Sequence, residues 1–233
     1  MNPLPHWKRY GAEALGLGLF MFGACLSVVW LEHPQSAGLA AFPDPLVRRT
    51  LMGLAMGAIA IINVYSPWGK LSGAHINPAV TVTFAALGRV EWAHAPYYVL
   101  AQTAGGTAGV ALAWALTGDL MTDPHTFFAV TVPGPSGVAV AFLAEAVISA
   151  GMMTMALLVS GSRFKNWTGV GAGVLVALYI IVEAPLSGMS MNPARTLASA
   201  WLAGEYRSLW IYFAAPFLGM GLAAAVIQRS RGR

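Results

Sequence analysis

Six long apolar stretches, separated by short polar segments, dominate the hydrophobic pattern of the chain. They cover residues 11–31, 46–65, 93–116, 138–159, 168–186 and 209–227. Each stretch is close to the ~20 residues that an α-helix needs to cross the ~30 Å hydrocarbon core of a bilayer. The pattern therefore predicts an all-α integral membrane protein with six transmembrane helices.

Composition also favours a membrane over an aqueous environment. Hydrophobic residues make up 57% of the 233 residues and charged residues only 9%, whereas a soluble domain carries roughly 25% charged residues. The net charge of +4 does not indicate nucleic acid, because the basic residues lie in short clusters between the apolar stretches and form no stripe that suits a phosphate backbone. We expect the lipid bilayer, and no nucleic acid, as a partner.

The distribution of Lys and Arg predicts the orientation, since cytoplasmic loops carry an excess of both residues. An even number of spans places both termini on one side. Nine basic residues fall on that side, namely Lys8, Arg9, Lys70, Arg89, Arg163, Lys165, Arg229, Arg231 and Arg233. Three fall on the other side, namely Arg48, Arg49 and Arg207. We therefore expect both termini in the cytoplasm and a plasma or inner membrane as the location.

A repeat relates the two halves of the chain. The Ala-Glu-Ala sequence around Glu13 in the first stretch recurs around Glu145 in the fourth. Small residues four apart recur in matching order, as Gly53 and Gly57 with Gly169 and Gly173, and as Gly105 and Gly109 with Gly219 and Ala223. Because each half holds an odd number of spans, the second copy enters the membrane inverted. We interpret residues 1–233 as one transmembrane domain built of inverted repeats 11–117 and 138–228.

A nine-residue motif occurs once in each half, at residues 72–80 and 187–195. The two copies read SGAHINPAV and SGMSMNPAR, and each is followed by about ten mostly apolar residues. Such a segment is too short to span a bilayer as a helix. Asn is a favoured N-cap and Pro a favoured first helical residue, so each Asn-Pro predicts the start of a short re-entrant half-helix.

Two re-entrant segments predict a pore, because irregular backbone at membrane depth occurs only where it is buried in protein or lines a water-filled cavity. The half-helix N-termini would meet near the midplane, with about half a unit of positive charge each. Each Asn oxygen caps its helix, which leaves the Asn NH₂ as a donor into the pore. Flanking carbonyls would line the route as acceptors, from Gly73, Ala74, His75, Gly188, Met189 and Ser190. We expect the positive centre to oppose cations and protons.

These residues together resemble the aquaporin or major intrinsic protein family over nearly the whole chain. The resemblance is carried by the motifs Asn77-Pro78-Ala79 and Asn192-Pro193-Ala194, by Arg195 directly after the second, and by Glu13 and Glu145. It implies the aquaporin fold, a passive channel for water and small uncharged solutes, and a homotetramer with one pore per subunit. It also implies solute contact by both Asn side chains, an outer constriction at Arg195, a cytoplasmic pore wall at His75, and bracing of the re-entrant loops by both Glu side chains.

The resemblance also indicates which solutes pass. The glycerol-passing branch of the family typically has Asp after the Arg and a basic residue four positions further on, whereas this chain has Thr196 and Ala200, which looks like the water branch. The expected selectivity filter consists of Met56, Ile180, Met189 and Arg195. Water channels usually carry His at the place of Ile180, so Arg195 here faces a mostly apolar ring. We therefore predict that hydrogen peroxide, urea or glycerol passes besides water.

No metal or cofactor is expected from the sequence. The single Cys25 lies within the first apolar stretch, so neither a disulfide framework nor a cysteine metal site is available. His75 has no second His or carboxylate at ligand spacing.

Two other classes of function remain open on the sequence alone. A proton- or ion-coupled secondary transporter would use Glu13 and Glu145 as carriers, since intramembrane carboxylates often relay protons, although their symmetric placement favours bracing. A membrane enzyme would need a nucleophile, a base and an orienting group close together, and the sequence indicates no such constellation. Glu183 is expected to be solvated at the outer mouth rather than paired with Arg195.

Overall fold

The computed structural model describes residues 6–231, and all the regular structure within them is helical. Six of the helices are long and apolar enough to cross a membrane, so the predicted all-α membrane fold is confirmed. They are α1 (His6–Glu32), α3 (Pro45–Tyr65), α6 (Ala95–Thr117), α7 (Val138–Ser160), α8 (Thr168–Val182) and α11 (Ile211–Arg231). The span formed by α8 begins at Lys165, in the 3₁₀ turn that leads into the helix. Arg233, one of the basic residues expected on the cytoplasmic side, lies outside the described residues.

Two of the spans that differ from their predicted boundaries do so near a proline. α6 begins at Ala95 rather than at residue 93, with Pro96 in its first turn. α8 ends at Val182 rather than at residue 186, and a separate short helix, α9 (Ala184–Ser187), follows with Pro185 in its first turn. Because proline lacks a backbone N–H and fits best at the start of a helix, the chain ends one helix and begins another at this point.

Short helices follow the two Asn-Pro motifs, as predicted. α5 (Pro78–Ala86) has 9 residues and α10 (Pro193–Ala203) has 11, so neither crosses a membrane alone. Both pack against α6 and α11 and against each other, which places them inside the bundle. The remaining short helices are α2 (Ala37–Ala41), α4 (Pro67–Ser72) and the 3₁₀ turns η1 (Gly118–Met121), η2 (Phe127–Ala129) and η3 (Lys165–Trp167).

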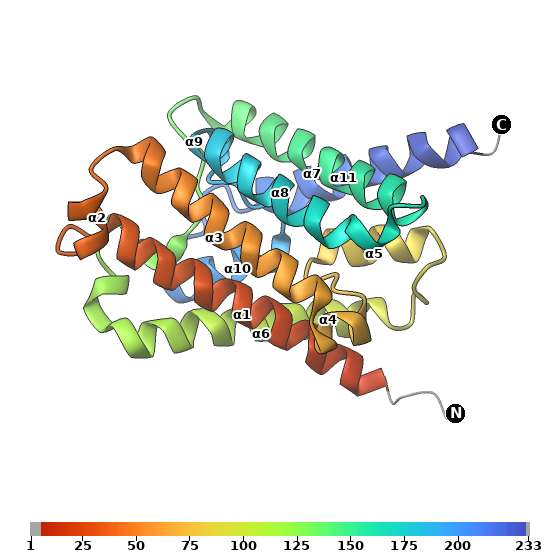
Figure 1. The fold of residues 1–233 in the computed structure, drawn as a ribbon, viewed down its shortest axis with the longest axis horizontal. Helices are drawn as coiled ribbons and strands as arrows, with labels where there is room; N and C mark the ends of the chain where they lie inside the picture. The colour runs from red at the N-terminus through yellow and green to blue at the C-terminus, as the bar shows by residue number, and fades with distance from the viewer. Residues whose placement is uncertain (1–5, 232–233) are drawn as a thin grey trace.

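The long helices pack in three close pairs: α1 with α6, α7 with α11, and α3 with α8. In Figure 1, α1 and α6 run along one edge of the molecule and α7 and α11 along the opposite edge. Small residues permit the approach, since a Cβ added to Gly105 would lie 2.0 Å from the Ala14 carbonyl oxygen, and one added to Gly219 would lie 2.2 Å from that of Ala146. The two pairs therefore meet at corresponding small residues of the two proposed repeats.

The third pair, α3 with α8, joins the two halves. A Cβ added to Gly57 would lie 2.5 Å from the Gly173 carbonyl oxygen, and a Cβ added to Gly173 would lie 2.5 Å from that of Gly57. The backbones of the two helices are thus in direct contact, which no larger side chain would permit.

Both ends of the described chain lie at the same end of the molecule (Figure 1). α1 begins at this end, and α7 begins at the opposite end. The second half of the chain therefore runs through the bundle in the direction opposite to the first.

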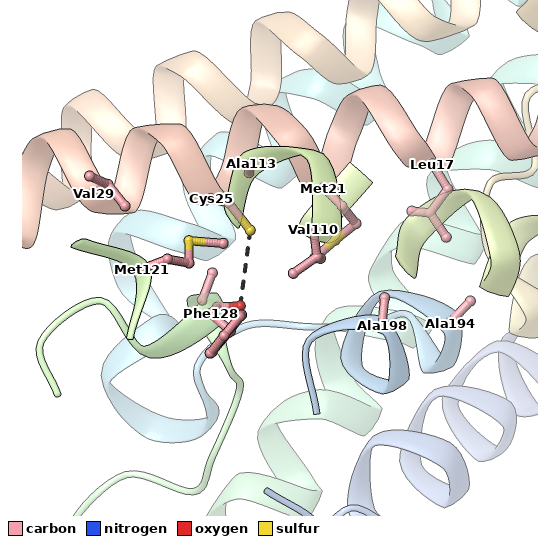
Figure 2. Packing of buried hydrophobic residues seen from close by; sticks show 11 residues of the cluster. Leu17, Met21, Cys25, Val29, Val110, Ala113, Met121, Phe128, Ala194 and Ala198 are labelled. Carbon is pink, nitrogen blue, oxygen red and sulfur yellow. Dashed lines mark hydrogen bonds between the residues drawn. The ribbon is translucent and has the colours of Figure 1, made fainter. Parts of the chain in front are cut away.

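A packed apolar cluster joins α1, α6 and α10 (Figure 2). Met21 and Cys25 of α1 meet Val110 of α6 and Ala198 of α10. The Cys25 side chain is fully buried, and its thiol lies 4.0 Å from the Phe128 carbonyl oxygen. The only cysteine of the chain is therefore part of the helix packing.

Candidate functional site

The two Asn-Pro motifs form matching helix starts. Asn77 is the N-cap of α5, and its Oδ1 accepts a hydrogen bond from the Ala79 N–H at 2.8 Å. Asn192 is the N-cap of α10, and its Oδ1 accepts from the N–H groups of Ala194 at 3.1 Å and Arg195 at 3.2 Å. The first helical positions are held by Pro78 and Pro193. Each Asn oxygen is thus occupied in capping its own half-helix.

Each Asn amide reaches across to the opposite motif. Asn77 Nδ2 donates to the Met191 carbonyl oxygen at 2.8 Å, and Asn192 Nδ2 donates to the Ile76 carbonyl oxygen at 2.7 Å. This reciprocal pair ties the two half-helix N-termini together, a link the sequence analysis did not foresee. Since each Nδ2 carries two hydrogens, a second donor is left on each Asn.

The backbone before each motif has the same unusual conformation in both halves. The first loop has positive φ angles at Gly73 (+96°), Ala74 (+50°) and Ile76 (+42°). The second loop repeats them at Gly188 (+84°), Met189 (+51°) and Met191 (+53°). Residues other than Gly adopt this region at a cost of roughly 1–2 kcal/mol each, so contacts from the surrounding helices must hold both loops in place.

Glu13 of α1 provides such contacts for the first loop. Its Oε1 accepts from the His75 N–H at 3.0 Å, and its Oε2 accepts from the Ile76 N–H at 2.6 Å. Gln102 of α6 donates from Nε2 to the same Oε2 at 2.6 Å. Because the carboxylate is fully buried, these three donors take the place of water.

Glu145 of α7 makes the corresponding contacts to the second loop. Its carboxylate accepts from the N–H groups of Ser190 and Met191, both at 2.7 Å, and from the Ser187 hydroxyl at 2.6 Å. A tyrosine also ties each loop to its helix pair: Tyr98 donates to the Ser72 carbonyl oxygen, and Tyr212 to that of Ser187. The two loops are therefore supported in the same way from opposite sides.

A cavity of about 610 Å³ passes between the half-helices. Its lining reaches from Glu32, at the end of α1, to Ser160, at the end of α7, and these two helix ends lie at opposite ends of the molecule. Asn77 and Asn192 line it, together with the expected filter and loop residues, namely Met56, Ile180, Met189, Arg195, Gly73, Ala74, His75, Gly188 and Ser190. The predicted residues that do not line it are Pro78, Ala79, Pro193, Ala194, Glu13 and Glu145.

Arg195 is held at one side of this cavity by a loop contact. Its Nη1 donates to the Ala129 carbonyl oxygen at 2.9 Å, and 8% of the residue is exposed. Ala129 and its neighbour Phe128 have φ angles of +51° and +53°. Nothing in the sequence indicated this partner, because positive φ at non-glycine residues leaves no reliable local signal.

Four further methionines of the cavity wall were not predicted from the sequence. Besides Met56 and Met189, the cavity is lined by Met52, Met152, Met155 and Met191. Met56, Met189 and Met191 pack with Ile180 in one buried cluster, and Met52 and Met152 pack against it. The sequence does contain a signal for them, because Met52 and Met56 on α3 are four positions apart and Met152 and Met155 on α7 are three apart. Residues at these separations lie on the same face of a helix.

His75 lies where the cavity meets a smaller hollow of about 390 Å³ near the termini. Its Nδ1 lies 3.1 Å from the Thr81 hydroxyl, which itself donates to the Asn77 carbonyl oxygen. With the Thr81 hydroxyl proton assigned to Asn77, Thr81 accepts from His75 and Nδ1 carries the proton. In a neutral imidazole this leaves Nε2 as an acceptor. Phe84 packs edge-on against the ring.

At the other mouth, His125 lines the cavity beside an acidic residue. The His125 backbone N–H and its ring Nδ1 both lie 2.8 Å from Asp123 Oδ1. These contacts, the backbone hydrogen bond most of all, hold the pKa of Asp123 below its usual value. This mouth therefore carries an ionised carboxylate at neutral pH.

Glu183 differs from its expected place. It is 5% exposed, does not line the cavity, and neither carboxylate oxygen has a hydrogen-bond partner among residues 6–231. The expectation of a solvated side chain at the mouth was therefore wrong. The reason is that α8 ends at Val182 and Glu183 itself forms the junction with α9, where the chain packs inside the bundle.

The position of the glutamates does not favour the coupled-transporter alternative. Glu13 and Glu145 lie behind the loops, and each accepts three hydrogen bonds from protein donors.

In the part of the chain that the structure describes, no three His, Cys, Asp or Glu side chains come together in a way that could hold a metal ion.

Comparison with known proteins agrees with this geometry. The sequence model of the family described as Major intrinsic protein matches residues 1–227. Aquaporin NIP6-1 of Arabidopsis thaliana is 34% identical over 221 residues, which cover 94% of this chain and 67% of the plant protein. Aquaporin NIP1-3 of Oryza sativa subsp. japonica is 36% identical over 214 residues, which cover 89% of this chain and 68% of that protein.

A solved structure has the same fold. The aquaglyceroporin from Plasmodium falciparum superposes with a TM-score of 0.78 over 95% of each chain, at 21% sequence identity. This likeness covers nearly the whole of both chains, so the overall fold is shared.

Proposed function

Since the chain belongs to the major intrinsic protein family, we propose that its cavity conducts at least one of hydrogen peroxide, urea and glycerol in addition to water. The protein is a passive transmembrane channel for water and small neutral solutes. The observation that supports the proposed route is one cavity that reaches both ends of the bundle with Asn77 and Asn192 on its wall. Solute moves down its own gradient, and no catalytic activity is proposed.

Selection against ions would arise where the two half-helices meet. The N-termini of α5 and α10 bring partial positive charges of about half a unit each to this point, and the remaining Nδ2 hydrogens of Asn77 and Asn192 offer two donors. A water oxygen that accepts from both Asn side chains is oriented with its hydrogens outward. A cation at this point meets the positive charge of both helix N-termini, and the two Asn side chains offer it donors rather than acceptors. Both effects oppose its passage.

Selection among neutral solutes would occur at the filter formed by Met56, Ile180, Met189 and Arg195. Three of these side chains are apolar and pack in one cluster, and the fourth supplies guanidinium donors. A solute with a polar edge and an apolar edge suits such a ring better than a fully polar one. Met side chains also adapt to irregular shapes because they have three rotatable bonds.

Solute flux in proteoliposomes tests this proposal. Stopped-flow light scattering should show fast water movement and uptake of at least one of the three solutes by the parent protein. Ile180→His adds a polar group to the ring and Met56→Phe adds a rigid one, so each should lower solute flux relative to water flux. Fast water movement with none of the three solutes taken up would overturn the proposed solute range.

We also propose the assembly and orientation that the family resemblance and the charge distribution support. The protein would form a homotetramer with one pore per subunit, in a plasma or inner membrane with both termini in the cytoplasm. Native mass spectrometry of the detergent-solubilised protein tests the subunit number. Protease protection of tags at the two termini tests the orientation, and cleavage of either tag from the outside would contradict it.

A further inference from the structure

Three of the methionines on the cavity wall are less buried than the other described methionines of the bundle. Met52, Met152 and Met155 line the cavity and are half-buried, so part of each side chain is open to solvent. Met153 follows Met152 directly but is fully buried against α11, away from the cavity. Met21 is likewise fully buried in helix packing. Met152 and Met153 are therefore neighbours on α7, but only the thioether of Met152 is accessible from the cavity.

Two of these three thioethers lie beside the filter. Met52 and Met152 pack against the cluster that contains Met56, Met189 and Ile180. Met155 is one turn from Met152 on the same helix face, and its sulfur would lie 2.9 Å from a Cβ added to Gly171 of α8. A solute in the cavity therefore passes along sulfur atoms next to the filter cluster.

From this placement we propose that Met52, Met152 and Met155 form an oxidation site within the pore, at which hydrogen peroxide converts the thioethers to sulfoxides and thereby lowers water conduction. The inference rests on the proposed function, because that function brings peroxide into the cavity. A sulfur lone pair attacks one peroxide oxygen, the O–O bond breaks, and that oxygen stays on the sulfur. Sulfur is oxidised by two electrons, and the second oxygen takes up the transferred hydrogen and leaves as water.

Oxidation slows conduction for a physical reason. A thioether is apolar, flexible and a weak acceptor, whereas a sulfoxide is polar and chiral and accepts strongly. Conduction requires that each contact be weak enough for the solute to leave. A sulfoxide on Met52 or Met152 places a strong acceptor against the filter cluster. Water is therefore held longer at this point, and the side chains of the wall adapt less readily to a passing solute.

The test uses the purified channel in proteoliposomes treated with hydrogen peroxide and then with catalase. Peptide mass spectrometry measures the sulfoxide fraction at each Met, and stopped-flow light scattering measures water flux. The variant is Met52→Leu/Met152→Leu/Met155→Leu, and the matched control is Met153→Leu, since Leu conserves the volume of Met. A peroxide-sensitive dye inside the vesicles measures peroxide influx separately.

We expect sulfoxide at Met152 well before Met153, a severalfold loss of water flux in the parent and the Met153→Leu control, and retained flux in the triple variant. Equal oxidation of Met152 and Met153, or an equal loss of flux in the triple variant, would overturn the inference. Absent peroxide influx with fast water flux would count against peroxide as a permeating solute. The oxidation pattern still decides the inference in that case, because external peroxide reaches the cavity from its mouths.

Discussion

Replacing Glu145 with Leu should destabilise the protein by removing the support of the second loop. The carboxylate accepts hydrogen bonds from two backbone N–H groups and one hydroxyl, at 2.6–2.7 Å. Each donor left buried without a partner costs about 1–3 kcal/mol, so three donors amount to about 3–9 kcal/mol. That is a large share of the ~5–15 kcal/mol that stabilises a typical folded protein. At ~2–4 °C per kcal/mol for a chain of this size, the unfolding temperature should fall by at least about 6 °C.

Thermal unfolding of the detergent-solubilised protein, followed by size-exclusion chromatography, measures this shift. Ser149→Ala is the matched control, because Ser149 lies one turn further along α7, is fully buried, and its hydroxyl has no partner among the described residues. It should leave the unfolding temperature unchanged or slightly raised. Glu145→Gln keeps one acceptor oxygen and should fall between the two. A Glu145→Leu protein as stable and as permeable to water as the parent would refute the bracing role.

Further predictions concern the thiol, the filter charge and the helix contacts. Mercurials should inhibit water flux only weakly, because Cys25 is buried away from the cavity. The variant Met189→Cys should instead be blocked by mercurials, and a thiol should reverse the block. Strong inhibition of the parent protein would contradict this prediction. Arg195→Val should raise proton or cation leak without loss of folding, and an unchanged leak, measured with a pH-sensitive dye, would show that the half-helix charges suffice. Gly57→Ala should lower the unfolding temperature, since its Cβ would lie 2.5 Å from a carbonyl oxygen; the control Gly221→Ala has no atom within 4 Å and should not.

The spans and half-helices were predictable because their signals are local. Span length follows from bilayer thickness, and the starts of α5 and α10 follow from the capping chemistry of Asn77 and Asn192 with the proline that comes next. The inverted direction of the second half follows from the parity of the spans alone. Each of these inferences needs only a few neighbouring residues or a simple count.

The partners of the predicted residues were not predictable, because they come from distant parts of the chain. Arg195 meets Ala129, 66 positions away, on a loop whose conformation has no sequence signature. The Asn77 amide was expected to face only solute, yet one hydrogen bond goes to Met191, 114 positions away. Glu183 became buried because the chain starts a new helix at α9 and turns inward. Packing of this kind depends on the whole bundle rather than on local pattern.

The reciprocal bonds between the two motifs also set an order of events during biogenesis. A chain is synthesised from its N-terminus, so α5 exists before Met191 and α11, its later partners, have been made. Until then the Ile76 carbonyl oxygen lacks the Asn192 donor, and an unsatisfied group of this kind costs several kcal/mol within lipid. The bonds that tie the first half-helix to the second can therefore form only after the second has been made, so the centre of the pore is completed late in the synthesis of the chain.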